Sequence, residues 1–123
     1  MHEEMQEYKI ILTWEAIYDV TDIADYIEKS ERLVLFFTAD WCPDCQFIYP
    51  ALPEIEEKFS TFTFLRIDRD DFLDLAKTWD VYGIPSFIVL EDGKEIGRFV
   101  SKARKTKAEI MAFLADLEGK TQA

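Results

Sequence analysis

The residues of this sequence best suited to chemistry are two cysteines, Cys42 and Cys45, which are separated by two residues. Two thiols at this spacing can form a reversible disulfide across the first turn of a helix. There the unpaired N–H groups and the helix dipole stabilise a thiolate on the first cysteine. Pro43 suits that turn, because its missing N–H costs nothing there. The pair therefore predicts thiol–disulfide exchange, with Cys42 as the attacking thiol and Cys45 as the resolving thiol.

Asp44 places a carboxylate between the two thiols. Repulsion between this carboxylate and a thiolate opposes the helix dipole and makes the reduced thiolate form less stable. We therefore expect the couple to act as a reductant and not as an oxidase.

Half of a zinc site is the structural alternative for such a cysteine pair. Zinc is usually held by four ligands, and apart from carboxylates the rest of the chain offers only His2. A disulfide-stapled secreted domain would spread more cysteines along the chain than these two. We predict no metal site and no bound cofactor.

Strands and helices must position this motif. Leu33–Thr38 is a continuous apolar run, which indicates a strand buried on both faces. Ile10–Val20 alternates like a strand but can in part be read as a helix. The other expected strands are Thr61–Asp68, Ser86–Leu90 and Glu95–Val100, the last two joined by a hairpin turn at Glu91–Lys94.

Four helices are expected between and after these strands. Pro50 should interrupt and kink the second of them, and Thr106 with Glu109 matches a capping box at the start of the last. That last helix carries Ile110, Phe113, Leu114 and Leu117 on one side. The first three are expected at Thr21–Lys29 with Thr21 as N-cap, at about Cys42–Lys58 and at Asp70–Trp79.

The order β-α-β-α-β-α-β-β-α predicts an α/β fold with a mixed sheet and helices on both faces. No repeat, linker or low-complexity tract divides the chain. We therefore expect residues 1–123 to form one domain, with residues 1–8 and 119–123 as mobile ends.

Composition narrows the function further. A net charge of −11 disfavours nucleic-acid binding and favours a monomer through self-repulsion. No stretch approaches the length of a membrane span, so no membrane association is expected. The first residues lack the positive region of a secretory signal, so we expect a cytoplasmic location.

The segment FFTADWCPDC, followed by YGIPSF and by the hairpin EDGKEIGRF, resembles the thioredoxin family over roughly residues 15–117. The resemblance implies a thioredoxin fold with a four- or five-stranded sheet and the activity of a protein-disulfide reductase. It implies roles in electron transport and cell redox homeostasis. The substrates would be disulfide-containing proteins or small molecules, and the electron donor a thioredoxin-reductase-like protein or a thiol pool. We expect a low reduction potential, in the region of the about −270 mV of thioredoxin.

The same resemblance assigns roles around the dithiol. Pro85 would follow a cis peptide bond opposite the cysteines, which an X-Pro bond tolerates. The backbone of Ile84 would pair with the substrate, and Trp41 and Pro43 would form part of the substrate-binding surface. The alternatives are an ordinary turn at Gly83–Pro85 and a core position for Trp41; the two motifs together favour the family assignment.

The sequence departs from the family beneath the second cysteine. The positions of the family's buried aspartate and its helper lysine are Phe36 and Phe64 here, so the usual proton acceptor is missing. We hypothesise that Asp44, or a water that it holds, accepts the Cys45 proton. The alternative is that Asp44 merely favours the helix N-terminus.

Two further departures bear on partners. Thr38 and Ser101 replace a tryptophan and a glycine that contact partners in the family, so recognition by a standard thioredoxin reductase does not follow from the resemblance. A basic strip begins in the second strand of the hairpin and continues beyond it, and it could steer acidic substrates. We favour the alternative that the strip is simply a solvated face without a specific partner. The strip consists of Arg98, Lys102, Arg104, Lys105 and Lys107.

The sequence thus predicts a thiol–disulfide oxidoreductase. Two rival functions remain: a disulfide isomerase or oxidase acting on exported proteins, and a binding module with the same fold and little turnover. Asp44 counts against the first rival, because it disfavours an oxidising couple.

Overall fold

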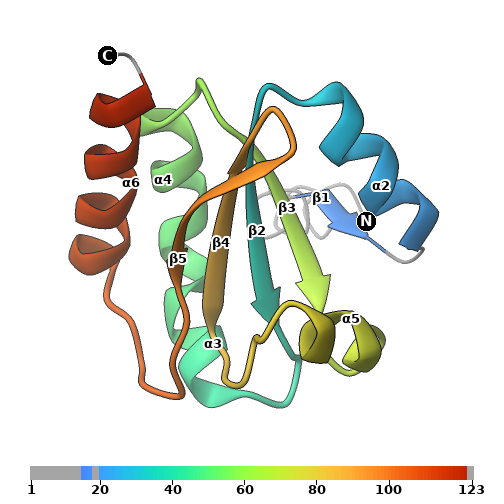
Figure 1. The fold of residues 1–123 in the computed structure, drawn as a ribbon. Coiled ribbons are helices and arrows are strands. Elements are labelled where there is room, and N and C mark those ends of the chain that lie inside the picture. Colours follow the sequence, from blue (N-terminus) through green and yellow to red (C-terminus); the bar gives the residue numbers. More distant parts are fainter. Residues whose placement is uncertain (1–14, 18–19, 122–123) are drawn as a thin grey trace, which may run out of the picture.

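The computed structural model describes residues 15–17 and 20–121, which form a five-stranded sheet flanked by helices (Figure 1). The strands run in the order β1-β3-β2-β4-β5. The pairs β1–β3 and β3–β2 are parallel, whereas β2–β4 and β4–β5 are antiparallel. Their bounds are β1 Glu15–Ile17, β2 Arg32–Thr38, β3 Thr63–Asp68, β4 Ser86–Glu91 and β5 Lys94–Phe99. This mixed sheet confirms the predicted fold class.

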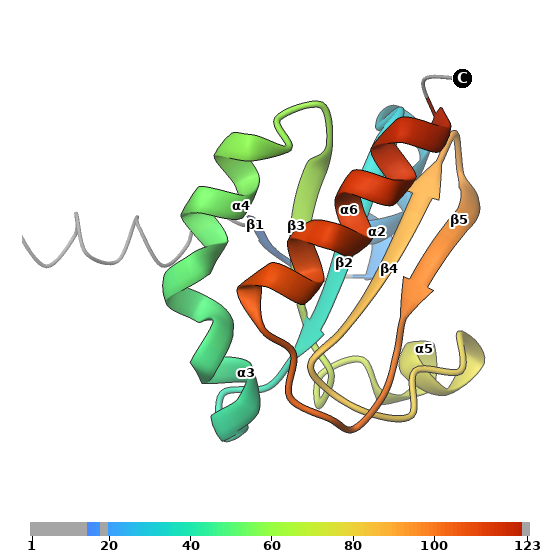
Figure 2. The same ribbon diagram turned by 90° about the vertical axis from the view of Figure 1, so that its left-hand side faces the viewer.

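Helices cover both faces of the sheet (Figures 1 and 2). On one face, Ile23 of α2 and Ala76 of α5 pack against Leu35 and Ile88 of the central strands. On the other face, side chains of α3, α4 and α6 pack against Val34, Phe36 and Phe87. The helices are α2 Val20–Lys29, α3 Pro43–Ile48, α4 Leu52–Lys58, α5 Leu73–Thr78 and α6 Lys107–Thr121.

The central strand β2 explains why two cores form. Residues 33–38 are all buried, and their side chains alternate between the two faces. Leu33, Leu35 and Phe37 therefore enter one core, while Val34 and Phe36 enter the other. The end of β2 leads directly into the cysteine motif, so both cores support the residues that carry the chemistry.

The helix expected at Cys42–Lys58 is interrupted near Pro50, as predicted. A single 3-10 turn, η1 Tyr49–Ala51, separates α3 from α4. The turn arises because a proline inside a helix cannot donate an N–H and its ring clashes with the preceding turn. As a result the cysteines lie on a short helix of their own.

Two local predictions are confirmed by their hydrogen bonds and dihedral angles. The N–H of Thr106 donates to Glu109 Oε1 at 2.9 Å, and the N–H of Glu109 donates to Thr106 Oγ1 at 3.1 Å, which is a reciprocal capping box. Asp92 and Gly93 have φ values of 50° and 82° between β4 and β5. Positive φ at both central residues matches the twist of a tight hairpin.

Several boundaries differ from the prediction. The first predicted strand lies mostly outside the described residues, and α2 begins at Val20, so Thr21 lies inside the helix and does not cap it. Helix α5 begins at Leu73 and not at Asp70. The side chain of Asp68 accepts a hydrogen bond from the N–H of Asp70 at 2.8 Å, which holds that residue in a turn before the helix.

The predicted ends of the chain also differ in part. Helix α6 continues to Thr121, so Gly119 is helical although we expected a frayed end from that residue. Residues 1–8 lie outside the described residues.

Candidate active site

Cys42 occupies the N-cap position of α3, where β2 and its following turn present it to the helix. Its backbone is extended, with φ −86° and ψ 111°, and its Sγ accepts a hydrogen bond from the N–H of Cys45 at 3.2 Å. Pro43 follows in the first helical turn, as expected from its missing N–H. The first sulfur is therefore held at the end of the helix where a negative charge is stabilised.

Cys45 lies one turn further into α3 and is completely buried, with 0% of its surface exposed. Burial, followed by a hydrogen bond with Cys42, raises the pKa of the Cys45 thiol from 9.0 to about 12. Hydrogen bonds from the Thr38 side chain and the Ala39 backbone act in the opposite direction. At neutral pH the second thiol is therefore protonated. Both cysteines are free thiols, which corresponds to the reduced dithiol.

The loop before β4 contains the expected proline. The peptide bond between Ile84 and Pro85 is cis, and both residues are buried. The hydroxyl of Ser86 donates to the carbonyl of Gly83 at 2.6 Å and closes the loop. Gly83 itself approaches the backbone of Ser101, so this loop is packed against the segment that leads into α6.

Trp41 is 60% exposed, as the interpretation of it as a surface residue predicted. Its Nε1 donates to Asp70 Oδ2 at 2.6 Å, and the Arg69 guanidinium lies 5.7 Å from its ring centroid. Two exposed aromatic residues that we did not single out are Phe47 on α3 and Tyr82 before the cis bond. The YGIPSF motif contains Tyr82, and a helical wheel of residues 43–48 would have shown Phe47.

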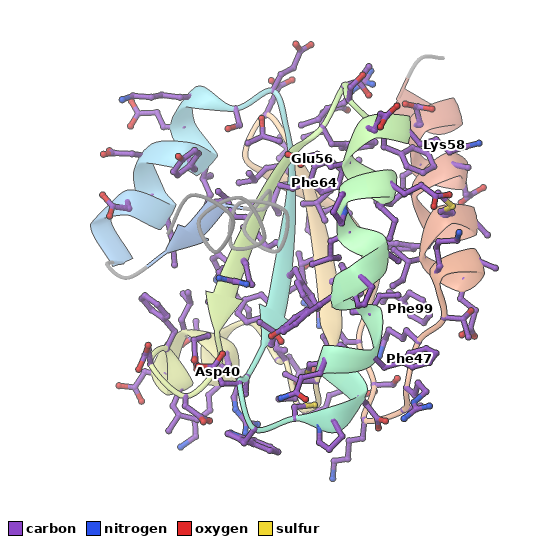
Figure 3. All side chains as sticks on the ribbon, turned by 180° about the vertical axis from the view of Figure 1, so that it is seen from behind. Asp40, Phe47, Glu56, Lys58, Phe64 and Phe99 are labelled. Atoms are coloured by element: carbon purple, nitrogen blue, oxygen red, sulfur yellow. The ribbon has the colours of Figure 1, made fainter. Side chains whose placement is uncertain are left out.

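Asp44 lies between the two cysteines in sequence, but its carboxylate is paired with a residue sixty positions later. Arg104 Nε donates to Asp44 Oδ1 at 2.9 Å. The same guanidinium lies 4.2 Å from the ring centroid of Phe47, which Figure 3 labels on α3. The segment before α6 is thus attached to the cysteine helix by one arginine.

The interpretation of the basic strip as a solvated face is wrong at Lys105, because this residue is only 1% exposed. Its Nζ donates to Ser101 Oγ and to the Ala103 carbonyl, both at 3.0 Å, and lies 5.1 Å from the ring centroid of Phe99. Burial lowers the pKa of the Lys105 amine, whereas negative charge on Cys45 when it is a thiolate, on Glu109, on Asp44 and on a Cys42 thiolate acts in the opposite direction. A buried amine therefore lies close to the dithiol.

The remaining strip is largely paired within the protein. Lys107 Nζ lies 3.1 Å from Glu54 Oε1 on α4, and Arg98 Nε lies 3.0 Å from Glu95 Oε2 on β5. These ion pairs neutralise charges that a steering surface would need to present. The geometry thus weakens the interpretation that the strip attracts acidic substrates.

The two positions where the thioredoxin resemblance implied a buried charged pair hold apolar rings. Phe36 is fully buried and stacks on Phe87 with centroids 4.8 Å apart, and Phe64 is buried as well. Beside Phe36, the hydroxyls of Thr38 and Tyr49 are 2.8 Å apart, a contact that we did not anticipate. The sequence gives little indication of this hydroxyl contact, because the contact depends on the direction that η1 takes after α3.

Among the residues that the structure describes, no group of three or more His, Cys, Asp or Glu side chains could hold a metal ion. None of the helices in that part of the chain has the length and apolar character needed to cross a bilayer.

Comparison with known proteins gives a consistent result. The Thioredoxin family model matches residues 16–116. A thioredoxin H-type of Picea mariana is 33% identical over 101 residues, which cover 82% of this chain and 81% of that protein. Thioredoxin H5 of Arabidopsis thaliana is 35% identical over 82 residues, covering 67% of this chain and 70% of its own.

Among solved structures, mitochondrial thioredoxin 3 of Saccharomyces cerevisiae in its oxidised form resembles this chain with a TM-score of 0.76. The match covers 87% of this chain and 98% of that one, at 23% sequence identity. At this identity the likeness establishes the fold alone.

Proposed function

The chain belongs to the thioredoxin family, and from that premise we propose that Cys42 attacks a substrate disulfide and that Cys45 resolves the product. The protein is a thiol–disulfide oxidoreductase of the protein-disulfide reductase class. The observation that carries the assignment of the two roles is the hydrogen bond of 3.2 Å from the Cys45 N–H to Cys42 Sγ. It supports Cys42 as the sulfur at which negative charge is stabilised.

The reaction balances as two successive exchanges. The Cys42 thiolate attacks one sulfur of the substrate disulfide, a mixed disulfide forms, and the other substrate sulfur leaves as a thiolate that takes a proton from water. Cys45 then loses its proton and attacks Cys42 Sγ, which releases the second substrate thiol. The substrate gains two electrons, and the chain becomes the Cys42–Cys45 disulfide, which an external donor must reduce.

The substrate is proposed to bind across the dithiol. The exposed ring of Trp41 and the exposed Pro43 support a contact surface on one side. On the other side, the buried pair Ile84–Pro85 would present its backbone to the substrate chain. Extended peptides commonly bind through such main-chain hydrogen bonds.

For Asp44, acceptance of the Cys45 proton remains a proposal. The ion pair with Arg104 occupies one carboxylate oxygen and supports the alternative, a structural role at the start of α3. An Asp44→Asn variant distinguishes the two, because only loss of a proton acceptor would slow the second exchange.

Partners and location are proposed from composition and chemistry. The substrates are disulfide-containing proteins, and the donor is a thioredoxin-reductase-like protein or a thiol pool. A net charge of −11 supports a monomeric protein. Since both cysteines lie in the redox motif and none serves as a structural staple, we propose that the chain acts in the reducing cytoplasm, in electron transport and redox homeostasis.

Reduction of insulin disulfides with dithiothreitol as donor tests the proposal. The parent should turn over well above background, Cys42→Ser should be inactive, and Cys45→Ser should accumulate a mixed disulfide detectable by mass spectrometry. Turnover that survives Cys42→Ser would exclude Cys42 as the attacking thiol. A parent rate at background would favour the binding module.

A further inference from the structure

The second exchange requires the Cys45 thiol to lose a proton in a place that water does not reach. The thiol is fully buried, and burial is the main reason for its raised pKa of about 12. Phe36 and Phe64, where the resemblance implied an acid and its helper, offer only hydrocarbon. Some other group must therefore take this proton.

Thr38 is a buried polar side chain that interacts with the thiol. It closes β2, is 3% exposed, and makes a side-chain hydrogen bond with Cys45. Its Oγ1 is also 2.8 Å from Tyr49 Oη. A hydroxyl carries one donor and two acceptor sites, so Thr38 can accept from the thiol while it donates to the tyrosine.

Tyr49 extends this chain of hydroxyls toward the surface. It lies in η1, directly after the cysteine helix, and its side chain is half-buried. Burial raises the pKa of the Tyr49 phenol, so the group stays neutral near pH 7 and can both accept and donate a proton. The Arg66 guanidinium lies 5.9 Å from its ring centroid. The Pro50 interruption thus places a half-buried phenol beside the buried hydroxyl of Thr38.

Other ionisable groups near the thiol are less suited to accept its proton. Lys105 donates to oxygens of Ser101 and Ala103, and a charged amine has no acceptor site. Asp44 is paired with Arg104. The titratable and charged groups that face the thiol or the phenol are Cys42, Lys105, Arg66 and Asp40.

We propose that Thr38 and Tyr49 form a hydroxyl relay for the second exchange. Thr38 is the catalytic residue that takes the proton from Cys45, and Tyr49 positions the Thr38 hydroxyl and carries the proton on to water. The Cys45 thiol gives its proton to Thr38 Oγ1, the Thr38 hydroxyl gives its own to Tyr49 Oη, and the phenol releases one to water. Both hydroxyls end as they began. The Cys45–Cys42 sulfur bond forms, the bond from Cys42 to the substrate breaks, and the released thiolate takes a proton from water.

A single-turnover experiment separates the two exchanges. The full chain in its reduced form is mixed with a chromogenic aromatic disulfide, which releases one coloured thiolate at each exchange. The variants are Thr38→Val and Tyr49→Phe, which remove a hydroxyl at nearly constant shape, and Thr38→Ser, which keeps it. Tyr26→Phe, in α2 on the other face of the sheet, is the matched control, and Asp44→Asn tests the rival acceptor.

We expect Thr38→Val to slow the second phase by about tenfold or more at pH 7, with the first phase unchanged, and Thr38→Ser to restore it. Tyr49→Phe should slow the second phase about threefold or more and move its pH profile to higher pH, whereas Tyr26→Phe has no effect. Unchanged second phases in Thr38→Val and Tyr49→Phe would overturn the relay. The relay would also be overturned if the second phase were slowed only in Asp44→Asn, or if the hydroxyl variants slowed both phases equally.

The proposal depends on the two-step mechanism, and the same traces test that mechanism separately. A parent protein that releases no thiolate, or only one, would overturn the mechanism and the relay with it. Two parent phases that are insensitive to the hydroxyl variants would overturn the relay alone. Urea unfolding of each variant confirms that the compared proteins are folded.

Discussion

Substitution of Gly83 by alanine tests how closely the loop before the cis bond must approach the segment before α6. A Cβ built at Gly83 would lie 2.5 Å from the Ser101 carbonyl oxygen, 2.6 Å from its carbon and 2.7 Å from the Lys102 nitrogen. All three are backbone atoms, so no side-chain rotation can relieve the clash. Ordinary contact begins at 3.4 Å, and the two segments would have to separate by about 0.9 Å.

We expect this variant to lose about 2–3 kcal/mol of stability, the upper part of the range for an overpacked site, because the backbone must move. For a domain of this size that corresponds to a Tm lower by roughly 6–15 °C. The displacement also moves Ser101, whose oxygen atoms hold the Lys105 amine. Since a misplacement of about 1 Å at a reactive site can cost up to about 100-fold in rate, insulin reduction should fall as well.

Two other glycines provide matched controls. A Cβ at Gly119 meets nothing within 4 Å, and this residue lies within α6, so Gly119→Ala should gain up to about 1 kcal/mol. A Cβ at Gly97 meets only the Leu117 side chain, which can move. The stability of Gly97→Ala should therefore lie between the stabilities of Gly83→Ala and Gly119→Ala. Thermal unfolding and insulin turnover of the three variants are the assays. A Gly83→Ala protein as stable and active as the parent would refute the reasoning.

The remaining predictions concern charge near the dithiol. The folded state keeps the Cys45 proton up to a pKa of about 12 while the unfolded chain releases it near 9.0. The contribution of the Cys45 proton to the free energy of unfolding is therefore complete below pH 9 and is lost toward pH 12 by about 1.4 kcal/mol per pH unit. Plots of unfolding free energy against pH, measured with urea for the parent and for Cys45→Ala, should diverge between these pH values, and parallel plots would contradict this expectation. Lys105→Met removes a buried cation that favours thiolates, so the reduction potential should become more negative by up to about 30 mV in a glutathione titration. The exposed Lys102→Met should not change it, and equal shifts in both would argue against a local effect. A double-mutant cycle of Arg104→Met and Asp44→Asn should give a coupling of only about 0.2–1 kcal/mol, because the pair is exposed; a coupling above about 2 kcal/mol would show that it is a structural anchor.

The features that could be predicted from sequence depend on local physics. The apolar run 33–38 has the composition of a buried central strand, and it is one. The hairpin at Asp92–Gly93 and the capping box at Thr106–Glu109 each involve residues at most three apart, so their geometry follows from residue type. The position of Cys42 at a helix N-terminus follows in the same way from Pro43 and the preceding strand.

The features that could not be predicted involve contacts between distant segments. A lysine in a run of charged residues is normally solvated. Lys105 is buried because the segment from Ser101 to Ala103 curls around its amine and supplies oxygen atoms. The ion pair of Arg104 with Asp44 joins residues sixty positions apart. The contact of Thr38 with Tyr49 depends on the break in the helix after α3, whose direction the sequence does not specify.

Strand β5 forms one border of the sheet and has a consequence for the protein at high concentration. Among the strands of residues 15–17 and 20–121, β5 pairs only with β4. Its ladder has an irregularity opposite Val89 and Leu90, and it exposes Lys94, Glu95 and Arg98. A strand from a second molecule that docked there would have to strip water from these charges and follow an irregular backbone. Edge strands of this kind are poor templates for the growth of intermolecular sheets. Fibrous aggregation through β5 is therefore disfavoured.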